Sequence, residues 1–337
     1  MESSDDRRPA FGNRKLINPE DVYKYNAWDD VQWNNEQAAA AEARIAEQKA
    51  SPMSDNNKAK ILASPSKSWD MFYGNHENRF FKDRHWLFTE FPELLSESST
   101  HKDKDRFTIL EVGCGVGNTA FPLMENFPST SNVFMYCCDY SSKAVKLVKE
   151  NEAYDESRFQ CFKWDITTPC KSIETQTADD NDQIIAPGSI DFILLIFVLS
   201  AIQPSQIPAA ISNVVRLLRP GGMLAFRDYG EFDLAQLRLK PGRLMEDNFY
   251  ARGDGTCVRF FRQAEISELF TNALMDDPEY SLVEHRNWVD RRLIVNRGEG
   301  LKMHRIWLQC IYRKQRRTDG EPAKERNCDG FFESCGS

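Results

Sequence analysis

The sequence predicts an α/β fold in which a mostly parallel sheet is covered by helices on both faces. Apolar, β-prone runs alternate with helix-compatible stretches from residue 107 to residue 273. The first run, Phe107–Val112, ends in three glycines at alternate positions, Gly113, Gly115 and Gly117. The chain has 337 residues and 41% hydrophobic residues, enough for one large domain with additions or for two small domains.

The predicted elements follow each other in the order of an alternating fold. Strands are expected at Phe107–Val112, Val133–Asp139, Phe159–Trp164, Ile190–Val198, Met223–Arg227, Ser281–Asp290 and Met303–Cys310. Helices are expected from Asn34 or Asn35 to Gln48, in two pieces over Ser68–Leu95, and at Thr119–Asn126, Ser142–Asn151, Ile207–Leu218 and Gln263–Ala273. Residues 50–66 are predicted to be a linker, and the acidic segment 171–187 is predicted to be a loop.

The charge is unevenly distributed along the chain. The net charge is −8, which does not by itself favour nucleic acid. From residue 286 to residue 317, however, there are ten Lys or Arg and two acidic residues. This basic segment on an acidic body is expected to provide a surface for phosphates.

The cysteines indicate a reduced chain. Nine cysteines occur without a C-x-x-C pair or a His cluster, so we expect free thiols, no structural zinc and no other metal. The N-terminal residues lack the apolar region of a secretory signal, and their acids disfavour a mitochondrial transit peptide. The apolar run Phe192–Ile202 is too short to span a bilayer. A cytosolic or nuclear protein is expected, and the cytoplasm is the favoured compartment.

The glycine motif narrows the class of protein. A dinucleotide-binding fold needs G-x-G-x-x-G, whereas here the third glycine follows the second after one residue, and Glu111 lies two residues before Gly113. The motif resembles the first motif of class I S-adenosylmethionine-dependent methyltransferases, and a glycine-rich turn in another α/β protein is the alternative. The resemblance implies a Rossmann-like sheet of seven strands and S-adenosylmethionine as cofactor.

Acids follow two further predicted strands, at the edge where α/β sheets bind ligands. Asp139 could accept both ribose hydroxyls of an adenosine, or it could be a helix N-cap. Asp165 suits the adenine amino group, with Ile166 covering the ring, or it could be an ordinary turn residue. Ile196 and Phe197 end the fourth strand, where they could line the cofactor site or simply belong to the core.

Charged and aromatic residues mark a second part of the expected cleft. Arg227, Asp228 and Tyr229 end the fifth strand; the alternative is a buried Arg–Asp ion pair that braces the turn. The loop Arg252–Thr256, followed by Arg259, suits phosphate positioning or is only a tight turn.

These pieces together resemble the tRNA N3-methylcytidine methyltransferases. The matching motifs are Ala27–Trp33, Phe80–Trp86, Leu110–Asn118, Ile196–Ala201, Phe226–Gly230, Arg252–Thr256 and Lys302–Trp307. The Trp-containing arm is similar to the branch that acts on threonine and arginine tRNAs. Two departures, Cys257 where Arg is expected and a weakly basic stretch at 296–300, bear on the tRNA preference.

The resemblance implies a site and a reaction. The cofactor contacts are expected at Trp69, Tyr73, Gly113, Gly115, Asp139, Asp165, Ile166 and Ile196. The target is expected to be cytidine 32 in a tRNA anticodon loop. Cytosine N3 is mostly unprotonated at neutral pH, so no strong base is needed, and Asp228 is expected to stabilise the cationic product ring. The residues expected to contact RNA are Lys82, Arg84, His85, Arg227, Tyr229, Arg252, Arg259 and Arg305.

We expect the chain to consist of three parts. Residues 1–66 are expected to be a partly disordered arm and linker that contacts RNA, 67–317 the methyltransferase domain, and 318–337 a disordered tail. The tryptophans of the arm could instead pack on the main domain. The expected partner is the tRNA anticodon stem-loop, with an aminoacyl-tRNA synthetase or an adaptor protein as a further candidate. The rival functions are methylation of a protein or small molecule and a non-catalytic binding subunit.

Overall fold

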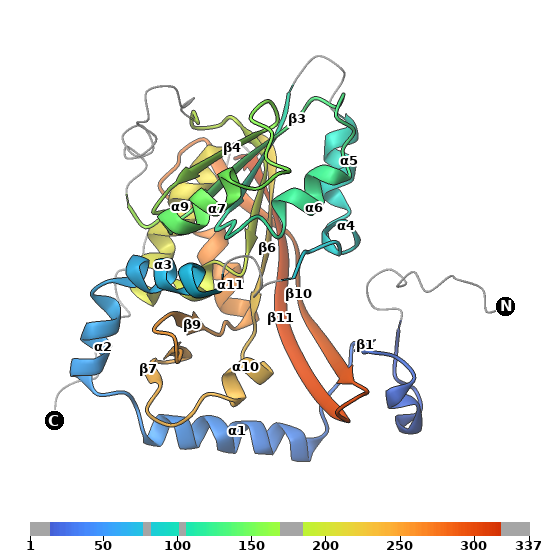
Figure 1. Ribbon diagram of the computed structural model, residues 1–337, viewed down its shortest axis with the longest axis vertical. Coiled ribbons are helices and arrows are strands. Elements are labelled where there is room, and N and C mark those ends of the chain that lie inside the picture. Colours follow the sequence, from blue (N-terminus) through green and yellow to red (C-terminus); the bar gives the residue numbers. More distant parts are fainter. Residues whose placement is uncertain (1–13, 77–81, 101–105, 169–184, 318–337) are drawn as a thin grey trace.

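The computed structural model describes residues 14–76, 82–100, 106–168 and 185–317. Its centre is an eight-stranded sheet with the order β1-β10-β11-β6-β5-β2-β3-β4, and a separate three-stranded sheet has the order β7-β8-β9. Strands β6, β5, β2, β3 and β4 are parallel to one another, whereas β11, β10 and β1 are added antiparallel at the edge next to β6 (Figure 1).

The elements have the following bounds. The strands are β1 Ala27–Asp29, β2 Phe107–Val112, β3 Val133–Asp139, β4 Phe159–Lys163, β5 Ile190–Ile196, β6 Leu218–Tyr229, β7 Leu244–Glu246, β8 Phe249–Ala251, β9 Cys257–Arg259, β10 Tyr280–Asn296 and β11 Leu301–Arg316. The α-helices are α1 Asn35–Ala50, α2 Asp55–Leu62, α3 Pro65–His76, α4 Leu87–Glu90, α5 Glu93–Thr100, α6 Ala120–Glu125, α7 Ser142–Lys149, α9 Ile207–Leu217, α10 Leu234–Leu237 and α11 Gln263–Thr271. Short 3-10 helices are η1 Pro19–Tyr23, η3 Leu199–Ala201 and η4 Pro204–Gln206.

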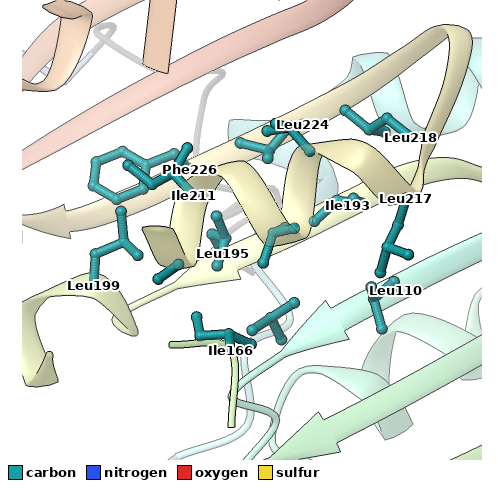
Figure 2. Packing of buried hydrophobic residues seen from close by; sticks show 14 of the residues in the cluster. Leu110, Ile166, Ile193, Leu195, Leu199, Ile211, Leu217, Leu218, Leu224 and Phe226 are labelled. Carbon is teal, nitrogen blue, oxygen red and sulfur yellow. The ribbon is translucent and has the colours of Figure 1, made fainter. Parts of the chain in front are cut away.

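The sheet is apolar on both faces, as expected for parallel strands between two helical layers. Successive residues of a strand point to opposite faces. Accordingly, Leu110 packs in the cluster that includes α9 and α11, whereas Ile109 packs in the cluster that includes α4 and α6. Figure 2 shows the first of these layers, with Ile211 of α9 beside Leu195 and Phe226 of the sheet.

The structure confirms the alternating core and corrects several boundaries. The sheet has eight strands where seven were expected, because the arm contributes β1. Strand β6 begins at Leu218, five residues before the expected Met223, so Gly221 and Gly222 lie within the strand, beside a register shift between Ile190 and Phe192. The late strands β10 and β11 are 17 and 16 residues long, well beyond the predicted bounds, since they pair with each other along most of their length.

The predicted linker and the first helices also differ from expectation. Residues 55–62 of the linker form α2, and α3 starts at Pro65. The two helical pieces expected over Ser68–Leu95 are α3 and two short helices, α4 and α5. Most of the predicted 171–187 loop, the first 13 residues and the 318–337 tail lie outside the described residues.

The described part of the arm packs against the rest of the chain. Trp28 is 5% exposed, and its indole N–H donates to the Val22 carbonyl at 2.8 Å. Asn34 forms a capping box with Gln37 at the start of α1. Gln48, near the end of α1, donates to the carbonyls of Gln236 and Leu239 at 2.9 and 2.8 Å. Trp28 packs with Leu293 and Val295 of β10, as expected under the alternative in which the tryptophans of the arm pack on the main domain.

In the part of the chain that the structure describes, no helix combines the length and the apolar character that a bilayer crossing requires.

Candidate cofactor and substrate site

A cavity of about 340 Å³ lies at the carboxyl ends of the parallel strands. Its floor comes from the ends of β2, β3 and β5 and the loop after β4, and the remaining walls come from the α2–α3 region, η3–η4 and the small sheet. The lining residues are Leu62, Pro65, Trp69, Tyr73, Val112, Gly113, Asp139, Tyr140, Trp164, Asp165, Ile166, Thr167, Phe197, Val198, Ala201, Ile202, Gln203, Gln206, Phe249 and Cys257.

The glycine loop is shaped by close contacts that a side chain would prevent. Gly113 and Gly115 have φ values of +66° and +55°, a region that L-residues with side chains avoid. A Cβ atom on Gly113 would lie 2.6 Å from Val198, and one on Gly115 would lie 2.9 Å from the Tyr73 hydroxyl. The loop therefore approaches α3 and η3 closely and leaves its backbone next to the cavity.

Asp139 ends β3 at the cavity wall, and backbone amides hold its carboxylate. Its two oxygens accept from the backbone N–H groups of Gly115 and Ser141, each at 2.8 Å. Burial raises the pKa of Asp139 to about 6. Ser141, not Asp139, caps α7 by accepting from Ala144. No guanidinium or ammonium of a described residue pairs with Asp139, so no ion pair neutralises its carboxylate.

Asp165 and Ile166 line the same cavity just after β4. One oxygen of Asp165 accepts from the backbone N–H and the hydroxyl of Thr167, at 3.0 and 2.6 Å, which makes an Asx turn. Ile196 is placed differently: it is 1% exposed in the core, and its neighbours Phe197 and Val198 line the cavity instead.

Helix α3 forms one wall of the cavity with Trp69 and Tyr73, whose rings are stacked at 5.8 Å. Asp70, between them, accepts from the Ser141 hydroxyl at 2.5 Å and from the Lys143 N–H at 3.2 Å. The N-terminus of α7 therefore anchors the helix that carries both aromatic residues.

The structure adds residues that sequence reasoning missed. Leu62 of α2, Phe249 of β8 and Cys257 of β9 complete the walls. The three residues pack in one hydrophobic cluster. Just before α2, the Met53 N–H also donates to the Leu244 carbonyl of β7 at 2.8 Å. Cys257, noted only as a departure from a family pattern, is a buried free thiol whose pKa burial raises to about 11.

Asp228 lies fully buried behind the cavity. Its carboxylate accepts from the backbone N–H groups of Ser200 and Tyr229, each at 2.9 Å, and burial raises its pKa to about 6. The ring of the next residue, Tyr229, meets the ring of Phe197, which lines the cavity, at 5.0 Å. Phe197 has a φ of +60°, which is strained for a bulky residue and places its ring at the cavity.

Arg84 links the 82–88 segment to the glycine loop. Its guanidinium donates to the Thr119 hydroxyl at 2.7 Å, lies 3.8 Å from the Glu111 carboxylate and sits 5.6 Å from the Phe197 ring centre. Burial raises the pKa of Glu111 to about 7. The neighbouring Lys82 and His85 are exposed.

The other arginines proposed from sequence fall into two groups. Arg252 lies 5.8 Å from the Tyr229 ring centre and forms no ion pair with a described residue. The rest are paired: Arg227 with Asp290 at 2.5 Å, Arg305 with Asp233 at 2.9 Å, and Arg259 with Glu265. Arg227 is 3% exposed and also donates to Gln309. It braces β6 against the hairpin with Asp290 as its partner, whereas the sequence alternative paired it with Asp228.

The residues fit an adenosyl sulfonium cofactor. Asp139 and Asp165 offer acceptors for hydroxyl and amino groups, and Trp69, Tyr73 and Ile166 offer flat apolar surface in the same cavity. Glu111, two residues before the glycine loop, is a buried carboxyl group 3.8 Å from the Arg84 guanidinium. The parallel sheet, the glycine loop and these acids define a class I methyltransferase that uses S-adenosylmethionine.

Comparison with known proteins identifies the family. A family model described as "Methyltransferase domain" matches residues 110–224. The chain is 44% identical to the tRNA N(3)-cytidine methyltransferase METTL2 of Xenopus tropicalis, over 93% of this chain and 96% of that protein. It is 45% identical to the Mettl2 enzyme of Drosophila melanogaster, over 90% of this chain and 88% of that one. The tRNA(Thr) (cytosine(32)-N(3))-methyltransferase of Saccharomyces cerevisiae is 40% identical over 90% of this chain and 45% of its own length. The chain belongs to the tRNA N(3)-cytidine methyltransferase family.

Proposed function

We propose that this chain transfers a methyl group from S-adenosylmethionine to N3 of cytidine 32 in the anticodon loop of tRNA, with threonine and arginine tRNAs as substrates. The observation that carries the proposal is the 44% identity to a named tRNA N(3)-cytidine methyltransferase over nearly the whole of both chains. The position and the threonine tRNA are supported by the yeast relative, which is a tRNA(Thr) (cytosine(32)-N(3))-methyltransferase. The arginine tRNAs rest on the resemblance of the arm alone.

We propose that the cavity residues hold the cofactor. Asp139 would accept from ribose hydroxyls and Asp165 from the adenine amino group, while Ile166, Trp69 and Tyr73 enclose the rings. Gly113 and Gly115 let the backbone approach the ligand. Ile196 would act from the core, by setting the strand end from which Phe197 and Val198 extend. The bound cofactor supplies a methyl group that its positive sulfur already activates.

We propose that this chain's contribution to the reaction is orientation, exclusion of water and electrostatic stabilisation. Cytosine N3 has its lone pair available at neutral pH, so no residue needs to remove a proton before attack. The cytosine ring becomes cationic as N3 is methylated. The negative charge of the buried Asp228, next to Tyr229 in β6, would stabilise that ring in a region of low dielectric constant.

We propose that the target base leaves its stack to reach the cavity and lies against Tyr229 and Phe197. Arg252, Lys82 and His85 would hold the phosphates around it; the first is unpaired among the described residues and the other two are exposed, which supports this role. Arg84 would position Phe197 and the glycine loop from behind. Arg227, Arg259 and Arg305 would act on RNA only through the elements that they brace.

We further propose the cytoplasm as the compartment. The six described cysteines are all free thiols, as in a reducing environment. An aminoacyl-tRNA synthetase or an adaptor protein stays a candidate partner, and the purified chain tests the need for one directly.

The test is incubation of the purified chain with total tRNA and methyl-labelled S-adenosylmethionine, followed by nucleoside analysis by mass spectrometry. We expect label in N3-methylcytidine, and in a threonine tRNA transcript but not in the same transcript with uridine at position 32. Label in protein or in a small molecule, with none in RNA, would overturn the proposal. Activity that appears only after addition of a synthetase would identify the partner.

A further inference from the structure

Two tyrosines are exposed at the tip of the β10–β11 hairpin, far from the cofactor cavity. Tyr23 of η1 and Tyr25 just before β1 are each 43% exposed. In Figure 1, η1 and β1 lie at the end of the hairpin opposite to β3, β4 and α7. The cavity and the reaction proposed above make no use of these residues.

Each tyrosine ring carries a cation. The guanidinium of Arg14 lies 4.3 Å from the centre of the Tyr25 ring, and the Lys302 ammonium lies 5.5 Å from the centre of the Tyr23 ring. Lys302 is exposed, and it forms no ion pair with another residue of the described ranges. Rings that accept stacking beside cations that contact phosphates are the combination used by proteins that bind unpaired nucleic acid.

The two rings stand on an ordered base. Trp28 packs edge-on against Tyr25 at 5.3 Å and belongs to a small core with Val22, Leu293 and Val295. The Tyr23 hydroxyl donates to the Gly300 carbonyl at 3.2 Å, which ties η1 to the hairpin tip. A ligand would therefore find the rings already in place, so that little ordering entropy is lost on binding.

The acids of this region have partners of their own. Asp21 lies 2.8 Å from Lys24, Asp30 lies 3.7 Å from Lys15, and Glu299 accepts from Asn296 at 3.0 Å. Glu20 is exposed at the start of η1. Three of these four acids already have partners. They are therefore expected to repel a polyanion bound at Lys302 less strongly than four free carboxylates would.

The surface is separate from the proposed base site. Trp307 pairs with Tyr229 of that site, and Lys302 lies five residues before Trp307 along β11. Five strand residues span about 17 Å. A tRNA whose target cytidine lies against Tyr229 can therefore reach the tip only with another part of its structure.

We propose that Arg14, Tyr23, Tyr25 and Lys302, the tyrosine surface, form a second contact for the same tRNA. The cations contact phosphates, and the rings pack on a ribose or stack on an unpaired base. The inference rests on the proposed function, because the tRNA substrate is the occupant. It gives the N-terminal arm a part in holding tRNA, although Trp28 itself is buried.

The experiment compares tRNA affinity, measured without cofactor, for the chain and its variants. The double variant Tyr23→Ala/Tyr25→Ala is expected to bind threonine tRNA at least tenfold more weakly, since loss of one stacked base costs roughly 1–3 kcal/mol. The matched control Tyr23→Phe/Tyr25→Phe keeps both rings and is expected to bind normally. Lys302→Ala is expected to lower the slope of log affinity against log salt by roughly 0.7–0.9, whereas Lys163→Ala, exposed at the opposite edge of the sheet, leaves the slope unchanged.

Kinetics separate this surface from the cavity. For the alanine double variant we expect KM for tRNA to rise with kcat unchanged, because the bound tRNA still reaches an intact site. Unchanged tRNA affinity in a folded alanine variant would overturn the surface, and so would a lowered kcat at unchanged KM. If the unsubstituted chain bound tRNA without forming N3-methylcytidine, only the proposed function would fail, since the affinity comparison does not depend on turnover.

Discussion

The cofactor cavity and the β10–β11 hairpin both contain buried carboxylates, but they hold them in different ways. Asp139 and Asp228 accept from backbone N–H groups and form no ion pair with a described residue. Asp290 is bound by Arg227 and Arg292, with separations of 2.5 and 2.9 Å. Backbone amides leave negative charge for a ligand, whereas arginines neutralise it for packing. The partner of a buried acid therefore indicates whether it can serve a ligand or serves the fold.

Ion pairs also occupy many of the cationic side chains in the basic segment at 286–317. Five arginines of this segment are paired with acids from elsewhere in the chain. The pairs are Arg286–Glu93, Arg292–Glu90, Arg292–Asp29, Arg292–Asp290, Arg305–Asp233, Arg313–Glu97 and Arg316–Glu279, with Arg227–Asp290 as the converse pair. Ion pairs therefore compensate half of the ten cationic side chains of the segment. The expected phosphate surface along this whole segment therefore narrows to single residues such as Lys302.

The largest effect is expected from breaking the hairpin network. Arg292→Met removes the common partner of Asp29, Glu90 and Asp290 and is expected to lower the free energy of unfolding by about 3–5 kcal/mol. Chemical denaturation measures it, with the exposed pair variant Arg316→Met as a control that changes little. A folded Arg292→Met chain with normal stability but weakened tRNA binding would place Arg292 in the RNA interface and contradict the comparison.

The next largest effect concerns Asp228. Asp228→Asn keeps an acceptor for the Ser200 N–H but removes the charge, so methyl transfer in a single turnover is expected to slow by roughly 10²–10³-fold. The affinity for S-adenosylmethionine is expected to stay near normal in calorimetry. Full turnover by the Asn variant would show that the charge is not used, and a loss of folded signal in circular dichroism would assign Asp228 to the fold.

A smaller effect follows from the raised pKa of Asp139. Burial raises this pKa to about 6, so the carboxyl group is mostly protonated below that pH. The neutral form is a weaker acceptor for the hydrogen bonds of hydroxyl groups. Cofactor affinity is therefore expected to fall about tenfold from pH 7 to pH 5, as only the ionised form binds well. Asp139→Asn is expected to bind weakly and without this pH dependence. A wild-type affinity that is flat over the same range would remove Asp139 from the cofactor contacts.

The smallest effect is expected at Arg252. Arg252→Ala is expected to weaken tRNA binding several-fold and to lower the salt slope by roughly 0.7–0.9, because one phosphate contact is lost. Arg313→Ala, whose arginine pairs with Glu97 at 2.6 Å, provides the matched control and is expected to leave the slope unchanged. Equal slopes for the two variants would mean that the unpaired arginine at the cavity contacts no phosphate.

The part of the site that lies on the sheet could be predicted, because it depends on local sequence. Gly113, Asp139 and Asp165 each follow a predicted strand, and parallel strands bring their carboxyl ends to one edge. The walls from Phe249 and Cys257 were missed, since strands of three residues have no periodic signal. The same limit explains the error at the linker, where α2 has no buried residue to mark its face.

The partners and orientations of individual side chains could not be predicted from the sequence, for a different reason. Arg227 lies next to Asp228 in the chain but meets Asp290, 63 positions away, because adjacent residues of a strand point to opposite faces. Phe197 was expected to share its role with Ile196, and the positive φ that turns Phe197 to the cavity has no signature in the residue type. Both outcomes depend on the assembled sheet.

The three residues of β1 also limit self-association of the protein. They pair with Arg292, Leu293 and Ile294 and so cover this part of the outer edge of β10, whose backbone amide and carbonyl groups would otherwise form a template for a neighbouring chain. A protein trimmed to begin after Trp33 would expose this ribbon together with Leu293 and Val295. Its first symptom would be self-association at high concentration, with the catalytic edge of the sheet still intact.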